Sequence, residues 1–78
     1  MTIVYWNYRR DTKLFLDDVA MASTIRSEYA GEKQIHYLIC YDSCNKEKQK
    51  VDMDYIIGVY HSGLDALAYH HKEDSNED

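Results

Sequence analysis

The chain has 78 residues, of which 45% are apolar, and a formal net charge of −5 at pH 7. A chain of this length forms one small domain that buries only about 60% of the surface exposed when unfolded, which leaves little volume for a deep catalytic cavity. It has no run of about 18 apolar residues, and its first charges follow the N-terminal apolar run, so we expect neither a membrane span nor a secretory signal. We therefore expect a cytoplasmic protein.

The negative charge is concentrated at the C-terminal end. Residues 72–78 hold four acids and one lysine, a net charge of −3, whereas residues 1–71 hold ten acids and eight bases, a net charge of −2. A segment so charged has little apolar surface to bury. We expect residues 1–71 to form a single α+β domain and residues 72–78 to be a disordered acidic tail.

The N-terminal segment predicts a hairpin. Residues 2–8 are rich in β-branched and aromatic side chains and predict a strand. Residues 9–12 are polar and predict a turn, after which residues 13–16 predict a second short strand. The alternative, that residues 13–16 begin the first helix, is left open.

A first helix is predicted from Asp17 or Asp18 to about Ala30, because an aspartate oxygen accepts the free N–H groups of a first helical turn. Gly31 is predicted to end this helix in the left-handed conformation. The side chains expected on the buried face are spaced three and four residues apart. They are Met21, Ala22, Ile25 and Tyr29.

Residues 34–41 are apolar on both faces apart from His36, a pattern typical of a central strand. A polar connection over residues 42–50 follows. Residues 51–59 alternate apolar and polar side chains, which predicts a half-buried strand. At Ser62 the period becomes helical, and residues 62–65 match a capping box in which Ser62 accepts a backbone N–H and Asp65 reaches back to another.

In chain order these elements predict an α+β fold, ββαββα. Four strands would form one largely antiparallel sheet, and the two helices would cover one face of it to bury their apolar stripes.

Two groups of residues are of types that carry chemistry. Cys40, Cys44, His70 and His71 are of the types that bind zinc, but adjacent helical histidines point about 100° apart, so we expect no metal and no cofactor. Asp52 and Asp54 would share one face of a strand without a third carboxylate or a phosphate-binding loop. We interpret these two aspartates as the solvated face of an edge strand and expect no enzymatic activity.

The aromatic content points to binding. The chain has eight tyrosines and one tryptophan, more rings than a domain of this size can bury, and both residue types are frequent in interface hot spots. We therefore predict a non-enzymatic protein-binding module whose exposed rings lie beside acidic groups. The predicted binding residues are Tyr5, Trp6, Asp17, Asp18, Asp52, Asp54 and Tyr55.

The alternative is a single-stranded nucleic-acid-binding domain. It would use Arg9, Arg10, Trp6 and a basic loop from Lys46 to Lys50, because rings beside cations hold bases and phosphates together. The net negative charge opposes this alternative, since neutralising phosphates supplies most of such affinity.

In size, acidity and absence of targeting, the chain resembles in type the small proteins with which phages and mobile elements inhibit host enzymes. The resemblance implies a host protein as partner, in the host cytoplasm. It further implies that ordered acidic groups could stand in for phosphates where that partner normally binds DNA.

Overall fold

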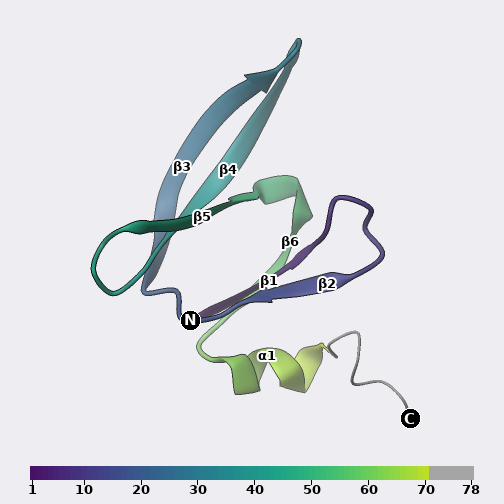
Figure 1. The fold of residues 1–78 in the computed structure, drawn as a ribbon. Helices are drawn as coiled ribbons and strands as arrows, with labels where there is room; N and C mark the ends of the chain where they lie inside the picture. The colour runs from purple at the N-terminus through teal and green to yellow at the C-terminus, as the bar shows by residue number, and fades with distance from the viewer. Residues whose placement is uncertain (71–78) are drawn as a thin grey trace.

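The computed structural model describes residues 1–70, which form six strands and two short helices (Figure 1). The strands pair antiparallel in two three-stranded sheets, one with the order β2-β1-β6 and one with the order β3-β4-β5, here called the β1 sheet and the β4 sheet after their central strands. The elements are β1 (Thr2–Trp6), β2 (Lys13–Leu16), β3 (Met21–Ala30), β4 (Lys33–Tyr41), β5 (Glu47–Asp52), η1 (Met53–Tyr55, a 3-10 helix), β6 (Ile56–Tyr60) and α1 (Gly63–Tyr69).

The predicted α+β fold, ββαββα with one four-stranded sheet and two helices, is wrong. The segment predicted as the first helix is strand β3. The residues predicted to form its buried stripe do not share a core: Met21, Ile25 and Tyr29 are 41%, 49% and 74% exposed. Their spacing imitates a helix because β3 is an edge strand with little burial on either face, so it lacks the alternation that marks a half-buried strand.

A two-residue turn joins β3 to β4. Ala30 pairs with Lys33, and Gly31 between them has φ +68°. Hairpin loops of two residues favour turns with glycine at the first position, where φ is positive. Gly31 is thus left-handed as predicted, but it closes a hairpin and does not end a helix.

The strand predicted over residues 51–59 is also interrupted. The Asp52 carboxylate accepts a hydrogen bond from the backbone N–H of Asp54 at 2.9 Å and caps η1, which separates β5 from β6. This short turn carries the chain from the β4 sheet to the β1 sheet. The two halves of the alternating segment therefore belong to different sheets.

Other predicted elements are confirmed. Residues 2–6 and 13–16 form the β1–β2 hairpin, which settles the alternative for residues 13–16 in favour of a strand. The predicted central strand is β4, between β3 and β5. In α1 the Ser62 hydroxyl accepts a hydrogen bond from the backbone N–H of Asp65 at 3.2 Å, as the capping sequence predicts.

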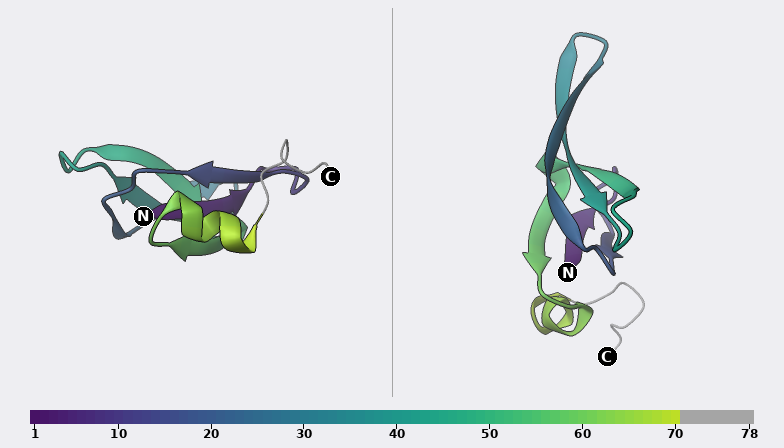
Figure 2. Two further views of the ribbon diagram at one scale, coloured as in Figure 1. Left: turned by 90° about the horizontal axis from the view of Figure 1, so that it is seen from below. Right: turned by 90° about the vertical axis from the view of Figure 1, so that its left-hand side faces the viewer.

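The core lies between the two sheets, and α1 covers the other side of the β1 sheet. Ile3 of the β1 sheet packs with Cys40 and Val51 of the β4 sheet. Val19, which lies between β2 and β3 in the chain, completes this cluster. Val4 is also fully buried, as is Ala66 of α1. Figures 1 and 2 show α1 on the side of β1 and β2 that faces away from the β4 sheet.

The β3–β4 hairpin projects from this body (Figure 2). Strand β5 pairs only with residues 37–41 of β4, so residues 27–36 form a two-stranded ribbon, here called the arm. The arm contributes to the elongated shape, with principal extents of 43, 31 and 14 Å.

Within residues 1–70 no helix has the length and apolar character needed to cross a membrane. The predicted acidic tail, residues 72–78, and His71 lie outside the described residues.

Candidate functional site

The turn between β1 and β2 is held by the side chain of Asn7. Its amide oxygen accepts hydrogen bonds from the backbone N–H groups of Asp11 and Thr12 at 3.1 and 3.3 Å, and its amide nitrogen donates to the Asp11 carboxylate at 2.7 Å. Arg10 adopts φ +60° within this turn. The turn therefore presents Tyr8, Arg9 and Arg10 from a defined backbone.

An open groove of about 350 Å³ lies where this hairpin meets the β4 sheet and η1. We call it the inter-sheet groove. Its walls come from four separate parts of the chain: the β1–β2 hairpin, β4, β5 and η1. The lining residues are Tyr5, Trp6, Asn7, Tyr8, Leu14, Tyr37, Lys50, Val51, Asp52 and Tyr55.

Tyr5, a lining residue of the groove, takes part in a hydrogen bond between the two sheets. Gln49 of β5 donates from its amide nitrogen to the Tyr5 hydroxyl at 2.7 Å. Tyr5 also packs against the core cluster with its ring. Tyr5 thus contacts the core cluster while its hydroxyl is hydrogen-bonded to the opposite sheet.

Arg10 contacts Tyr55, one of the lining residues of the groove. Its guanidinium carbon lies 4.2 Å from the centroid of the Tyr55 ring, and its Nη2 donates to the backbone carbonyl of Asp54 at 3.4 Å. A guanidinium over an aromatic face is attracted by the ring quadrupole, by about 0.5–1 kcal/mol at an exposed site. This contact links the β1–β2 turn to η1.

Three more cations lie over aromatic rings of the groove. The distances to the ring centroids are 5.9 Å for Arg9 over Tyr8, 5.7 Å for Lys13 over Trp6 and 4.6 Å for Lys50 over Tyr37. Four of the five aromatic residues that line the groove therefore have a cation nearby.

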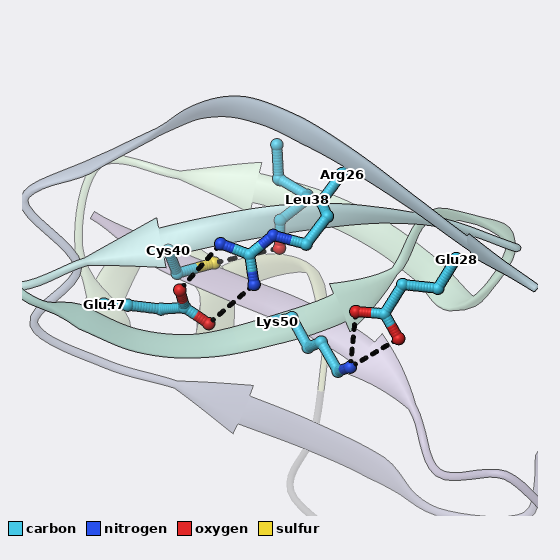
Figure 3. A network of polar contacts seen from close by, with 6 residues as sticks. All are labelled: Arg26, Glu28, Leu38, Cys40, Glu47 and Lys50. Carbon is cyan, nitrogen blue, oxygen red and sulfur yellow. Dashed lines mark hydrogen bonds and ion pairs between the residues drawn. The ribbon is translucent and has the colours of Figure 1, made fainter.

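Lys50 is further held by Glu28 of β3. Its Nζ lies 2.8 and 2.9 Å from the two carboxylate oxygens, and this hydrogen bond raises the pKa of Lys50. A second pair joins Arg26 of β3 to Glu47 of β5 at 2.9 Å, and its hydrogen bond raises the pKa of Arg26. Figure 3 shows both pairs passing across β4.

The structure divides the predicted binding residues among three places. Tyr5, Trp6, Asp52 and Tyr55 line the inter-sheet groove. Asp54 lies beside the groove in η1, where its backbone contacts Arg10.

Asp17 and Asp18 lie in a different depression, next to the start of α1, together with Met1 and His61. Asp17 accepts a hydrogen bond from the Thr2 hydroxyl at 2.9 Å, and Asp18 has φ +60°. Both aspartates shape the connection that follows β2, and the structure does not bring them to the groove.

Some of the residues predicted for nucleic-acid binding also lie together at the groove. Arg9, Arg10 and Trp6 lie at the groove. The predicted basic loop is instead mostly strand, because β5 begins at Glu47, and of its lysines only Lys50 lines the groove.

Sequence reasoning missed Tyr8, Leu14 and Tyr37 as groove residues. Tyr37 is 29 residues from Tyr8 along the chain, and only the packing of one sheet on the other brings the two rings together. Tyr8 carried a signal, since an aromatic residue in a polar turn next to Arg9 has no core to enter.

Cys40, Cys44 and His70, which are of the types that bind zinc, lie in different parts of the fold. Cys40 is buried, and burial raises the pKa of its thiol, whereas Cys44 is exposed in the β4–β5 turn. His70 contacts Lys13 and Tyr60. Within residues 1–70, no three residues of the metal-ligating types come together.

Comparisons of the chain with protein-family models, with curated proteins and with solved structures found no match.

Proposed function

We propose that the protein is a non-enzymatic binding module that holds a segment of another protein in the inter-sheet groove. The observation that carries the proposal is the convergence of five aromatic side chains from three parts of the chain, the β1–β2 hairpin, β4 and η1: Tyr5, Trp6, Tyr8, Tyr37 and Tyr55. Tyrosine and tryptophan dominate interface hot spots because a rigid ring offers large contact area at small entropic cost.

The charges at the groove define the kind of segment that fits. Neither Arg9 nor Arg10 forms an ion pair with a carboxylate in residues 1–70, so the positive charge of each is not neutralised there, although Arg10 also contacts Tyr55 and the Asp54 carbonyl. Asp52 is the acid that lines the groove. A segment with apolar or aromatic side chains flanked by acidic groups would satisfy both the rings and the arginines.

This arrangement does not favour mimicry of DNA. A mimic needs an ordered array of carboxylates facing the partner, and the groove presents more cations than acids. We therefore limit the proposal to protein binding, with inhibition of a host protein as one use of it.

A second candidate function is binding of single-stranded nucleic acid. The observation that favours it is that four rings of the groove each have a cation 4.2–5.9 Å from the ring centroid. In single-strand binding proteins, aromatic rings stack on bases while nearby cations neutralise phosphates.

Site-specific photocrosslinking tests the first proposal. A photoreactive phenylalanine analogue is placed at Tyr8 or at Tyr55, and as a control at Leu64, which is 81% exposed on α1 away from the groove. In a lysate of the source organism, we expect the same protein adduct from positions 8 and 55 and none from position 64. The adduct should disappear when Arg10→Glu is added, because the arginine then no longer attracts an acidic segment.

Trp6 separates the two candidates, because it is the single tryptophan of the chain and lines the groove. Its fluorescence should be unchanged by oligothymidine at physiological salt if the partner is a protein. Quenching by the oligonucleotide that weakens steeply with added salt would support the second candidate. Identical adducts from all three crosslinking positions would contradict the groove as the binding site.

A further inference from the structure

Strand β3 presents a long free edge. It has ten residues, pairs on one side with β4, and forms the outer edge of the β4 sheet in the described part of the chain. Its outer half belongs to the arm, which has only two strands, and an isolated two-stranded ribbon is marginally stable in water. Unpaired strand edges are templates for pairing with another chain, and β3 carries no proline that would block such pairing.

The hairpin turn determines which backbone groups of β3 are free. In a hairpin with a two-residue loop, the residues that flank the loop form a hydrogen-bonded pair, and such pairs then recur at every second residue. Here these pairs are Ala30–Lys33, Glu28–Ile35 and Arg26–Tyr37. The N–H and C=O groups of the intervening residues, Ile25, Ser27 and Tyr29, therefore point to the free edge.

We infer that the free edge of β3 pairs antiparallel with the β3 edge of a second copy of this chain, with the two-fold axis at Ser27. This register places Ser27 opposite Ser27 and Ile25 opposite Tyr29, so that the free backbone groups of both copies meet as hydrogen-bonded pairs. Ile25 and Tyr29 are 49% and 74% exposed in the single chain, and this pairing covers both side chains.

Charge selects this register over its neighbours. With the axis at Ser27, Arg26 of each copy faces Glu28 of the other as a non-hydrogen-bonded pair, in which side chains approach most closely. A shift that places the axis at Arg26 sets arginine against arginine, and one at Glu28 sets glutamate against glutamate. Like charges directly opposite each other are destabilising, so the two nearest alternative registers are disfavoured.

The ion pairs within each copy extend across the new contact. Arg26 is already bonded to Glu47 at 2.9 Å, and Glu28 is bonded to Lys50 at 2.8 Å, on the same face of the β4 sheet (Figure 3). In the dimer the order across the sheets becomes Glu47, Arg26, Glu28 of the second copy and Lys50 of the second copy. The signs of the charges then alternate along this row of four, and networks of this kind contribute more than isolated surface pairs.

The shape of the molecule permits this pairing. Strand β3 runs from the body toward the tip of the projecting hairpin (Figures 1 and 2). The pairing of β4 with β5 makes Ser27 the first residue of the arm in β3. In an antiparallel pair centred there, the two bodies lie at opposite ends of the shared ribbon. The paired segments are residues 24–30 of each copy.

The experiment measures the mass of the full-length chain in solution by light scattering over a concentration series. We expect the mass to approach twice the 9.2 kDa of one chain as concentration rises. Arg26→Glu places glutamates at both charged positions of the edge, and Glu28→Arg places arginines at both. Each variant alone should remain at the mass of one chain, because its own copies repel. An equimolar mixture of the two variants should recover the doubled mass, because every charge again faces its opposite.

Ser27→Pro provides a test that leaves the charges unchanged. Proline removes an N–H that points to the free edge and none that bonds to β4, so the hairpin should persist while the mass stays at that of one chain. A wild-type mass of one chain at every concentration would overturn the inference. So would a dimer that survives in the single variants, or a mixture of the variants that does not recover the doubled mass.

Discussion

Lys13 donates a hydrogen bond to Nδ1 of His70, with 3.1 Å between the two nitrogens. An ammonium group can only donate, so Nδ1 must be an unprotonated acceptor and the ring proton lies on Nε2. Nε2 in turn lies 2.6 Å from the Tyr60 hydroxyl. The neutral imidazole thereby links the end of α1 to β2 and β6.

This link predicts a pH dependence of stability. Burial and the charge of Lys13 lower the pKa of His70 from its ordinary value of 6.5. Above pH 6.5 the imidazole is neutral in both the folded and the unfolded state. As the pH falls below 6.5, the unfolded chain binds a proton that the folded chain does not, so the free energy of unfolding decreases until the lowered pKa is reached.

Urea denaturation of the wild type and of His70→Gln across this pH range measures the effect. The difference in unfolding free energy between the two proteins should shrink as the pH falls from 7 toward 5, because only the wild type loses the contribution of neutral His70. Parallel curves for the two proteins would show that His70 titrates equally in both states.

Gly58 is required by the position of the Tyr60 ring on the same strand. A methyl group added at Gly58 would lie 2.6 Å from the Tyr60 hydroxyl oxygen and 2.8 Å from a ring carbon. The ring has little freedom to retreat, since it stacks on Tyr69 at 5.7 Å between centroids and contacts His70. We expect Gly58→Ala to lower the unfolding free energy by roughly 1–3 kcal/mol. In a Tyr60→Leu background the same change should cost clearly less, and an equal cost would place the conflict elsewhere.

Local signals were sufficient for parts of the fold and not for others. The β1–β2 hairpin, strand β4 and the Ser62 cap were predicted because aromatic and β-branched content, continuous apolar character and a capping hydroxyl act within a few residues. Strand β3 was mispredicted as a helix because its stability comes from pairing with β4, while its own side chains are mostly exposed. The Gly31–Glu32 turn between two strand-length segments was the available hairpin signal.

The candidate site was also predicted only in part from local sequence signals. Tyr5, Trp6, Asp52 and Tyr55 were selected from composition and local alternation, and the structure places these four at one groove. No local pattern indicates that Asp17 and Asp18 lie elsewhere, because their distance from the groove depends on how the two sheets stack. Tyr37 reaches the groove for the same reason.

The burial of Ile39 predicts that this side chain contributes to stability although it lies outside the main core cluster. It is fully buried, yet it lies on the face of β4 opposite to Cys40 and the main core cluster. We infer that the Arg26–Glu47 and Lys50–Glu28 pairs, which cross β4 on that face, cover it with their aliphatic stems. Ile39→Ala should lower the unfolding free energy by roughly 2–5 kcal/mol.

Ile25→Ala is the matched control for this prediction, because Ile25 is on a neighbouring strand and 49% exposed. At a protein concentration low enough to prevent association, it should cost much less than Ile39→Ala in urea denaturation. Comparable losses from the two variants would mean that Ile39 is no better covered than an edge residue.

The hydrogen bond from Gln49 to the Tyr5 hydroxyl predicts a coupling between the two sheets next to the inter-sheet groove. Tyr5→Phe removes the acceptor and keeps the ring, so the unfolding free energy should fall by roughly 0.5–1.5 kcal/mol. Gln49→Leu removes the donor, and the double variant should cost less than the sum of the two single ones, because the second change has no bond left to break. Trp6 fluorescence, read from the same groove, follows unfolding in all four proteins. Strictly additive losses would show that the bond contributes nothing to holding β1 against β5, and the groove would then owe its shape to the packing of Tyr5 alone.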